Sequence, residues 1–338
     1  MAYFETTGLC PCGSGKPFKD CCFIKKEASD SPLKDLNQFI QPALGRMTFP
    51  SIAELNAGLD SIMRIRNSAA MDDFDGLSPE QMSRFLYHPF ESSHLIEFSH
   101  EVQCAATSPF MRLFLFLIEQ CSENSGLKAT VNGNLPRALC RDAAIEYCRE
   151  EENREQWRYS RITTETDFME LHTVRIVAVA TGFIKKARGR FMLTKSGKNI
   201  VNTGVTGNTL IKLLMAYTRK FNWGYNDLYQ ELHIVQDSFL YTLYVLQKHG
   251  DVFRPSSFYA DLFIKAFPSA LQKVAETPFC SKEEEVRRCY ILRSLERFAC
   301  FWGFADRKKG QGFSAGRSFE LKKTTLLDQM VSFHTGGK

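Results

Sequence analysis

Four cysteines near the amino terminus are the residues whose type and spacing most directly indicate chemistry. They are Cys10, Cys12, Cys21 and Cys22, a Cys-x-Cys pair and an adjacent Cys-Cys pair with eight residues between the pairs. Thiolates at this density select a tetrahedral metal ion, most often Zn²⁺. A closed site of four sulfurs leaves no position for water, so it is structural rather than catalytic. The spacing predicts one structural Zn²⁺ ion.

The residues between these cysteines fit a tight metal-binding turn. Pro11 bends the chain within the first pair, and the glycines at 13 and 15 permit a left-handed backbone. The run from Gly13 to Lys16 also looks like the end of a phosphate-binding loop. That reading fails because Cys10 stands where the loop needs glycine and Pro17 stands where it needs Ser or Thr.

The cysteine segment resembles the SEC-C motif, a small zinc-binding module found at the carboxyl end of the SecA translocation ATPase and on many bacterial proteins. The resemblance rests on Cys-Pro-Cys-Gly-Ser-Gly-Lys, the aromatic Phe18, and Cys-Cys. It implies the same four cysteine ligands, although Pro17 replaces a residue that is usually basic. In SecA the module binds protein partners. Nothing else in this chain resembles SecA, so that partner is not implied here.

Composition limits the class of protein to which the chain belongs. The 338 residues are 44% hydrophobic with a net charge of +5, which allows a substantial core and a mildly basic surface. Seven further cysteines are scattered, a pattern expected for buried thiols in a reducing compartment. The longest apolar run, Leu113 to Ile118, is too short to cross a membrane. With no secretory signal at the start, we expect a cytoplasmic protein that has no membrane partner.

A basic hairpin is predicted in the middle of the chain. One helix opens at Pro136, a second starts at Thr166 and ends at Gly182, and two short strands then flank an Arg-Gly turn over 183–194. Thr194 caps a further helix that runs to Val201. This order resembles a winged-helix domain.

Positive charge gathers on this hairpin and the helix after it, with no acidic residue over positions 182–198. Such a wing is suited to lie along a phosphate backbone of DNA or RNA. The alternatives are a solvated hairpin that closes a helical core and a protein-docking surface. The candidate nucleic-acid-binding residues here are Lys185, Lys186, Arg188, Arg190, Lys195 and Lys198.

A second, weaker copy of this layout is predicted near the carboxyl end. An amphipathic helix over Glu283 to Phe301 leads into Trp302-Gly303-Phe304, which repeats the earlier glycine-aromatic stop. A return strand is expected over Phe319 to Thr324. The candidate nucleic-acid-binding residues of this copy are Arg307, Lys308 and Lys309.

The expected fold is mostly α: a small amino-terminal zinc knuckle and a helical body with one or two winged-helix-like units, each made of helices and a β-hairpin. We expect five segments: a knuckle over 1–25, a linker and helical region over 26–122, a winged-helix-like unit over 123–205, a helical connector over 206–270, and the second unit over 271–338. This order of segments resembles that of bacterial SEC-C proteins. The resemblance implies no activity.

Catalytic patterns are scarce. Two Glu-x-x-His pairs lie within Glu91 to His100, but they share one segment, and an ordinary polar helix face is the favoured interpretation. Cys140 and Cys289 each follow or precede an arginine, yet a packing role is favoured for both. We predict no catalytic or cofactor-binding residue, and the assignment leans against an enzyme.

Three functions therefore remain open. The leading one is a zinc-containing nucleic-acid-binding or regulatory protein that uses its basic hairpins. The alternative is an adaptor that docks a protein partner through the zinc knuckle. An enzyme with an unrecognised site in the central helices is third. Binding of nucleic acid that weakens steeply with salt would favour the first.

Overall fold

The computed structural model describes residues 51–102, 107–123, 126–147, 162–227, 229–276, 280–309 and 319–336. The chain divides into two compact units, Met1–Ala69 and Ala70–Lys338. The four amino-terminal cysteines lie outside the described residues. In the first unit the described element is helix α3 (Ile52–Ser68), where the Ser51 hydroxyl accepts a hydrogen bond from the Glu54 amide.

The second unit is mostly helical, with small antiparallel sheets, as the sequence predicts. Its helices are α4 (Pro79–Tyr87), α5 (Pro109–Ser122), α6 (Arg137–Tyr147), α8 (Met169–Ala180), α9 (Lys195–Thr203), α10 (Gly207–Arg219), α11 (Ile234–Asp237), α12 (Phe239–His249), α13 (Ser256–Ala266), α14 (Lys282–Tyr290), η7 (Ile291–Cys300) and α15 (Thr325–Met330). Short 3₁₀ turns are η2 (Asp72–Phe74), η4 (Glu165–Asp167), η5 (Trp223–Asn226) and η6 (Pro268–Lys273). The strands are β1 (Ile96–Phe98), β2 (Leu127–Lys128), β3 (Ile184–Ala187), β4 (Arg190–Leu193), β5 (Arg254–Pro255), β6 (Ala305–Lys309), β7 (Phe319–Lys323) and β8 (Val331–Phe333).

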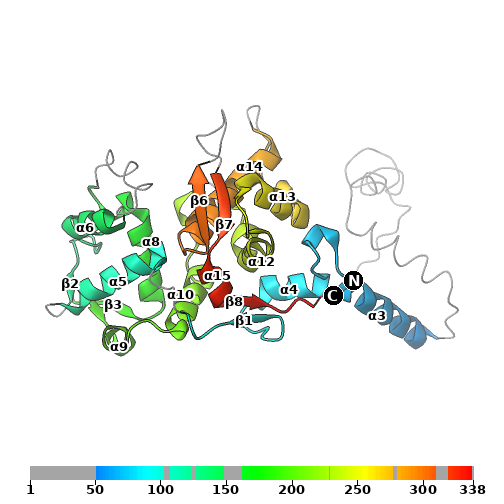
Figure 1. The fold of residues 1–338 in the computed structure, drawn as a ribbon, viewed down its shortest axis with the longest axis horizontal. Helices are drawn as coiled ribbons and strands as arrows, with labels where there is room; N and C mark the ends of the chain where they lie inside the picture. The colour runs from blue at the N-terminus through cyan, green and yellow to red at the C-terminus, as the bar shows by residue number, and fades with distance from the viewer. Residues whose placement is uncertain are drawn as a thin grey trace, which may run out of the picture. The chain divides into compact units, whose positions relative to one another are not determined.

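One order of elements occurs twice in this unit. We call residues 107–203 the first module and residues 239–330 the second module. In the described residues each has helix, strand, helix, helix, two further strands and a closing helix: α5-β2-α6-α8-β3-β4-α9, then α12-β5-α13-α14/η7-β6-β7-α15. The antiparallel sheets have the matching orders β2-β4-β3 and β5-β7-β6. Figure 1 shows the two arrangements, the first module from turquoise to light green and the second from yellow to red.

The corner between the third helix and its hairpin has the same hydrogen bonds in both modules. Gly182 adopts φ +75° and Gly303 φ +76°, the left-handed conformation that ends a helix. The Phe183 amide donates to Ala178 O at 3.1 Å, and the Phe304 amide to Ala299 O at 2.8 Å. A hydroxyl then closes each corner, because Thr194 Oγ1 donates to Gly182 O and Thr324 Oγ1 to Gly303 O, both at 2.6 Å. The predicted glycine stops are therefore confirmed.

The third helix of the second module has an unusual continuation. The predicted amphipathic helix begins as α14, but over η7 the backbone widens into a π-helix, as in the bond from the Phe301 amide to Glu296 O at 3.2 Å. Such widened turns are rare in proteins as a whole, but those that occur are often found at functional sites.

In the first module the matching helix starts at Met169, three residues later than predicted. The reason is that Asp167 accepts hydrogen bonds from the Thr163 and Thr164 amides and so forms the turn η4 before the helix.

A two-stranded sheet connects distant parts of the chain. β1 pairs with β8, and the register places Glu97 opposite Ser332. The predicted helix face over Glu91 to His100 is wrong, because this segment consists of turns followed by β1. Ser78 and Gln81 form a reciprocal capping box at the start of α4.

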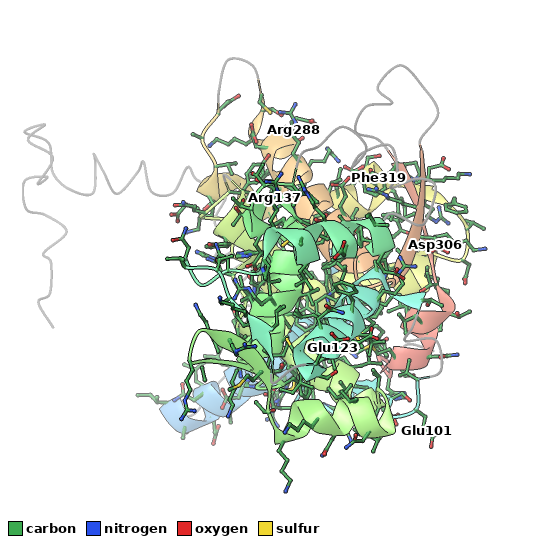
Figure 2. The ribbon with its side chains drawn as sticks, turned by 90° about the vertical axis from the view of Figure 1, so that its left-hand side faces the viewer. Glu101, Glu123, Arg137, Arg288, Asp306 and Phe319 are labelled. Atoms are coloured by element: carbon green, nitrogen blue, oxygen red, sulfur yellow. The ribbon has the colours of Figure 1, made fainter. Side chains whose placement is uncertain are left out.

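Aromatic packing joins the two modules. The Phe110 ring stacks on the Trp302 ring with centroids 4.3 Å apart, and the Phe110 amide donates to Phe301 O at 2.9 Å. The first helix of one module thereby docks onto the end of η7 in the other. Figure 2 turns the first module toward the viewer, with Arg137 labelled at the start of α6 and Glu123 directly after α5.

Candidate functional site

The basic residues of the first hairpin divide into two groups. Lys186 and Arg190 serve the fold: Lys186 Nζ donates to Gly133 O at 3.0 Å, and Arg190 Nη1 donates to Gly126 O at 2.6 Å. Both bonds tie the hairpin to the loops that flank β2. The other four side chains are exposed and have no hydrogen bond or ion pair within the described residues: Lys185, Arg188, Lys195 and Lys198.

Two of these cations line a groove beside the hairpin. Its volume is about 560 Å³, and its walls come from the end of α5, the strands β3 and β4, and helix α9. Lys185 and Lys198 line it together with Asn202, and no acidic side chain is among its described lining residues. Arg188 lies in the adjoining turn, with φ +50°. The arrangement is a shallow positive surface with room for a polyanion.

The second hairpin does not offer a comparable surface. Lys308 Nζ lies 3.0 Å from a carboxylate oxygen of Glu320 on the paired strand and 4.5 Å from the centroid of the Phe253 ring. Arg307 Nη1 lies 3.7 Å from Glu296 and lines a cavity. Lys309 stands opposite Phe319 in the strand register. The structure therefore does not place Arg307 and Lys308 together as unpaired cations.

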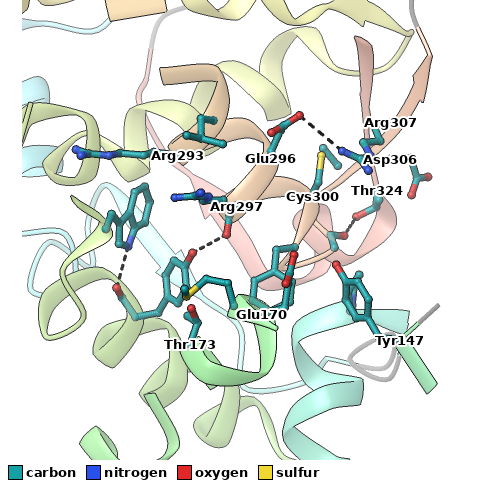
Figure 3. A pocket seen from close by; sticks show the side chains of 18 of the residues that line it. Tyr147, Glu170, Thr173, Arg293, Glu296, Arg297, Cys300, Asp306, Arg307 and Thr324 are labelled. Carbon is teal, nitrogen blue, oxygen red and sulfur yellow. Dashed lines mark hydrogen bonds and ion pairs between the residues drawn. The ribbon is translucent and has the colours of Figure 1, made fainter. Parts of the chain in front are cut away.

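A cavity of about 630 Å³ lies where the two modules meet. Helix α8 contributes Met169, Glu170 and Thr173, while η7 contributes polar side chains at positions 293, 296, 297 and 300. Strand β6 adds Asp306 and Arg307. Figure 3 shows Glu170 on one wall, with Glu296 and Arg297 on the wall that η7 forms.

Ion pairs and burial set the electrostatics of this cavity. Asp227 forms a buried pair with Arg293 at 2.5 Å and lies 3.6 Å from Arg297. Burial would raise the pKa of Asp227, but the Arg293 hydrogen bonds outweigh it and lower that pKa. For Glu170 and Glu296 burial prevails: it raises the pKa of each carboxyl, and Arg297 and Arg307 offset it only in part.

A second buried cluster supports α8 from the first module. Glu165 is fully buried, and its carboxylate lies 2.8 Å from His172 Nδ1 and 2.5 Å from Arg175 Nε. The same carboxylate accepts a hydrogen bond from the Leu135 amide at 2.6 Å. Burial alone would raise the pKa of Glu165, but these hydrogen bonds lower it below its usual value. The cluster fixes α8 against the loop before α6.

Three described cysteines, Cys140, Cys289 and Cys300, lack the low pKa of an activated nucleophile. Burial raises the pKa of Cys140, Cys289 and the cavity-lining Cys300 to about 12 each, so the reactive thiolate is scarce at neutral pH. The predicted packing role of Cys140 and Cys289 is confirmed, since both are buried. Within the described residues no group of three or more His, Cys, Asp or Glu side chains is placed to hold a metal ion, and no helix there is long and apolar enough to cross a membrane.

Comparison with protein families gives two matches, each to part of the chain. The SEC-C motif matches residues 9–23, which include all four amino-terminal cysteines. The chain therefore carries a SEC-C motif. The Y4jL N-terminal domain matches residues 106–205, nearly the same stretch as the first module. No curated protein and no solved structure matches the chain.

Sequence reasoning did not identify the cavity. Its signal was present in the amphipathic helix, where Arg293, Glu296 and Arg297 recur at helical spacing beside Cys300. The prediction for this helix used only its apolar face. Because the cavity forms between modules, the pattern of one helix could not reveal that its polar face is enclosed.

Proposed function

We propose that this protein is a zinc-containing nucleic-acid-binding protein whose first module contacts the phosphate backbone. The observation that carries the proposal is a set of four exposed cations without partners in the described residues, Lys185, Arg188, Lys195 and Lys198. Two of them, Lys185 and Lys198, line one groove. Phosphate contacts from Lys and Arg supply most of the sequence-independent affinity of such proteins. The second hairpin has no equivalent role in this proposal, since Lys308 is paired.

The order of elements supports a winged-helix interpretation of both modules. A three-stranded antiparallel sheet whose last two strands form a hairpin, packed on three helices, matches the order observed twice here. We therefore propose that the second winged-helix-like unit starts at α12 rather than at residue 271, and the pairing of β5 at 254–255 with β7 supports this boundary.

The third helix of the first module, α8, indicates how the protein would contact nucleic acid. In helix-turn-helix proteins that helix enters the major groove. Here α8 is largely covered, with Leu171, Val174 and Val177 fully buried, and its polar residues Glu170 and Thr173 line the cavity. We therefore propose backbone contact through the hairpin and α9, without reading of bases.

The SEC-C motif supports a structural zinc ion. The motif belongs to a zinc-binding module, and its ligands in this chain would be Cys10, Cys12, Cys21 and Cys22. Four thiolates suit Zn²⁺, which would stabilise the fold of the knuckle without taking part in a reaction.

The test is fluorescence anisotropy of the full chain with mixed-sequence duplex DNA and with single-stranded RNA over a salt series. Four backbone contacts predict that the logarithm of the affinity falls with log salt at a slope of about −3.6 on duplex DNA. The variant K185Q/R188Q/K195Q/K198Q should lose most of the affinity and of the slope. A matched control with the same change of charge, R84Q/K212Q/K273Q/K282Q, alters exposed residues elsewhere and should bind as the parent does.

Two results would contradict the proposal. One is equal loss of affinity in the control, which would mean that net charge alone determines binding. The other is no binding even at low salt, which would favour the adaptor function.

A further inference from the structure

We propose that the cavity between α8 and η7 is a binding site for a small organic cation, an amine with an aromatic or apolar body, whose ammonium group pairs with Glu170. This site is separate from the basic groove of the first module and does not depend on the proposed nucleic-acid function.

The arginines of the cavity are engaged by acidic residues. Arg293 forms two hydrogen bonds to Asp227, at 2.7 and 2.5 Å, and also donates to the carbonyls of Tyr229 and Leu232. Arg297 lies 3.6 Å from Asp227, and Arg307 lies 3.7 Å from Glu296. An anionic ligand would have to compete with a carboxylate for each guanidinium.

Glu170 is in the opposite situation. Within the described residues its carboxylate forms no hydrogen bond or ion pair with another residue, and it accepts only from its own backbone amide. It lines the cavity from the first turn of α8. By contrast, Glu165, five residues earlier, has three partners. Glu170 is therefore an acidic group of the cavity without a direct partner, on which Arg297 and Arg307 act only through their charge.

The walls suit an organic cation better than a metal ion. Aromatic rings of Tyr147, Trp223 and Phe301 line the cavity, and such rings attract cations as well as apolar groups. The volume of about 630 Å³ falls within the range typical of small-molecule sites. No three metal-ligating side chains converge in the part of the chain that the structure describes. The π-helical η7 on one wall is a further feature common at functional sites.

Burial couples this binding to pH. It raises the pKa of Glu170, whereas a bound ammonium group would favour the carboxylate, so binding should release a proton wherever the free protein holds Glu170 protonated. The ionisable groups that share the cavity are Tyr147, Tyr217, Arg293, Glu296, Arg297, Cys300, Asp306 and Arg307. Of these, Glu296 also has a raised pKa and would add to the effect in the same direction.

The experiment uses isothermal titration calorimetry on the full chain with three probes of similar shape: 2-phenylethylamine, 2-phenylethanol and 3-phenylpropionate. We expect the amine to bind at least tenfold more tightly than the alcohol or the acid. Its affinity should rise between pH 5 and pH 7, with proton release detected by comparing two buffers of different ionisation enthalpy.

Variants locate the site. E170Q keeps the size of the side chain and should weaken amine binding at least tenfold and remove most of the proton release. E283Q changes an exposed glutamate on α14 and should bind as the parent does. If E170Q does not fold, E296Q should reduce the proton release. The proposal is overturned if the amine does not bind, if it binds E170Q unchanged, or if 3-phenylpropionate binds more tightly, which would identify the arginines as the ligand-binding groups.

Discussion

At the scale of single residues, Glu165 shows how one buried carboxylate organises the first module. It accepts from the Leu135 amide before α6 and lies within hydrogen-bonding distance of His172 and Arg175 on α8, so one side chain fixes two helices. Removing one member of a buried ion pair leaves the other charge without compensation, which typically costs about 3–5 kcal/mol. The stability of this module should therefore depend on Glu165 more than on any surface glutamate.

Glu165→Gln should lower the free energy of unfolding by about 3 kcal/mol at pH 7, measured by urea denaturation. The folded-state pKa of Glu165 is lowered, so its contribution is present above its usual pKa of 4.5 and is lost as pH falls below that value. When the pH is lowered below 4.5, the variant should therefore lose less stability than the parent does. Glu119→Gln, an exposed change on α5, should alter stability by less than about 0.5 kcal/mol. Equal pH dependence in parent and variant would contradict this account.

Residue types in the sequence indicated where positive charge would gather, but not which charges remain available. Lys186 and Arg190 belong to the same basic run as Lys185, yet they are bound to the carbonyls of Gly133 and Gly126. Those carbonyls lie more than fifty residues earlier in the chain. A local pattern cannot predict contacts at that separation. The pairing of Lys308 with Glu320 and of Arg307 with Glu296 was missed because it depends on the register of β6 with β7 and on the packing of η7.

At the scale of elements, the repeated corner is the feature best predicted from sequence. Glycine before an aromatic residue marks a left-handed helix end, and a threonine after the hairpin starts the next helix. These local rules require no knowledge of the partner module, which is why they succeeded at both Gly182 and Gly303. The pairing of β1 with β8 and the π-helical form of η7 were not predicted, since both depend on contacts outside their own segments.

The two corner glycines should tolerate alanine unequally. Both have φ near +75°, so alanine at either site should cost about 1–2 kcal/mol from backbone strain. At Gly182 an added Cβ would meet no atom within 4 Å, whereas at Gly303 it would lie 3.0 Å from Ser108 Cα. Gly303→Ala should therefore destabilise by about 1–3 kcal/mol more than Gly182→Ala, measured as the shift of the urea midpoint. Equal shifts of the urea midpoint would mean that the backbone at Ser108 moves away from the added methyl group at no energetic cost.

At the scale of the whole molecule, the division at Ala69 separates the SEC-C motif from the body that holds the cavity and the basic groove. The core of the body is formed by residues after position 70, with Phe110 and Trp302 at the contact between modules. The motif was recognised from its cysteines because metal ligation depends on residue type and short spacing. The cavity was not recognised, because it exists only once two modules meet.

The division of the chain into two compact units leads to a prediction about zinc. Cys22→Ser should reduce the zinc content of the full chain from one ion to near zero, measured by inductively coupled plasma mass spectrometry. Because zinc binding would fold only the knuckle, the thermal transition and far-ultraviolet circular dichroism of the body should be unchanged. Cys280→Ser, which alters a cysteine of the body, should retain the zinc. A Cys22→Ser protein with full zinc would refute the ligand assignment, and one with an unfolded body would show that the two units depend on each other.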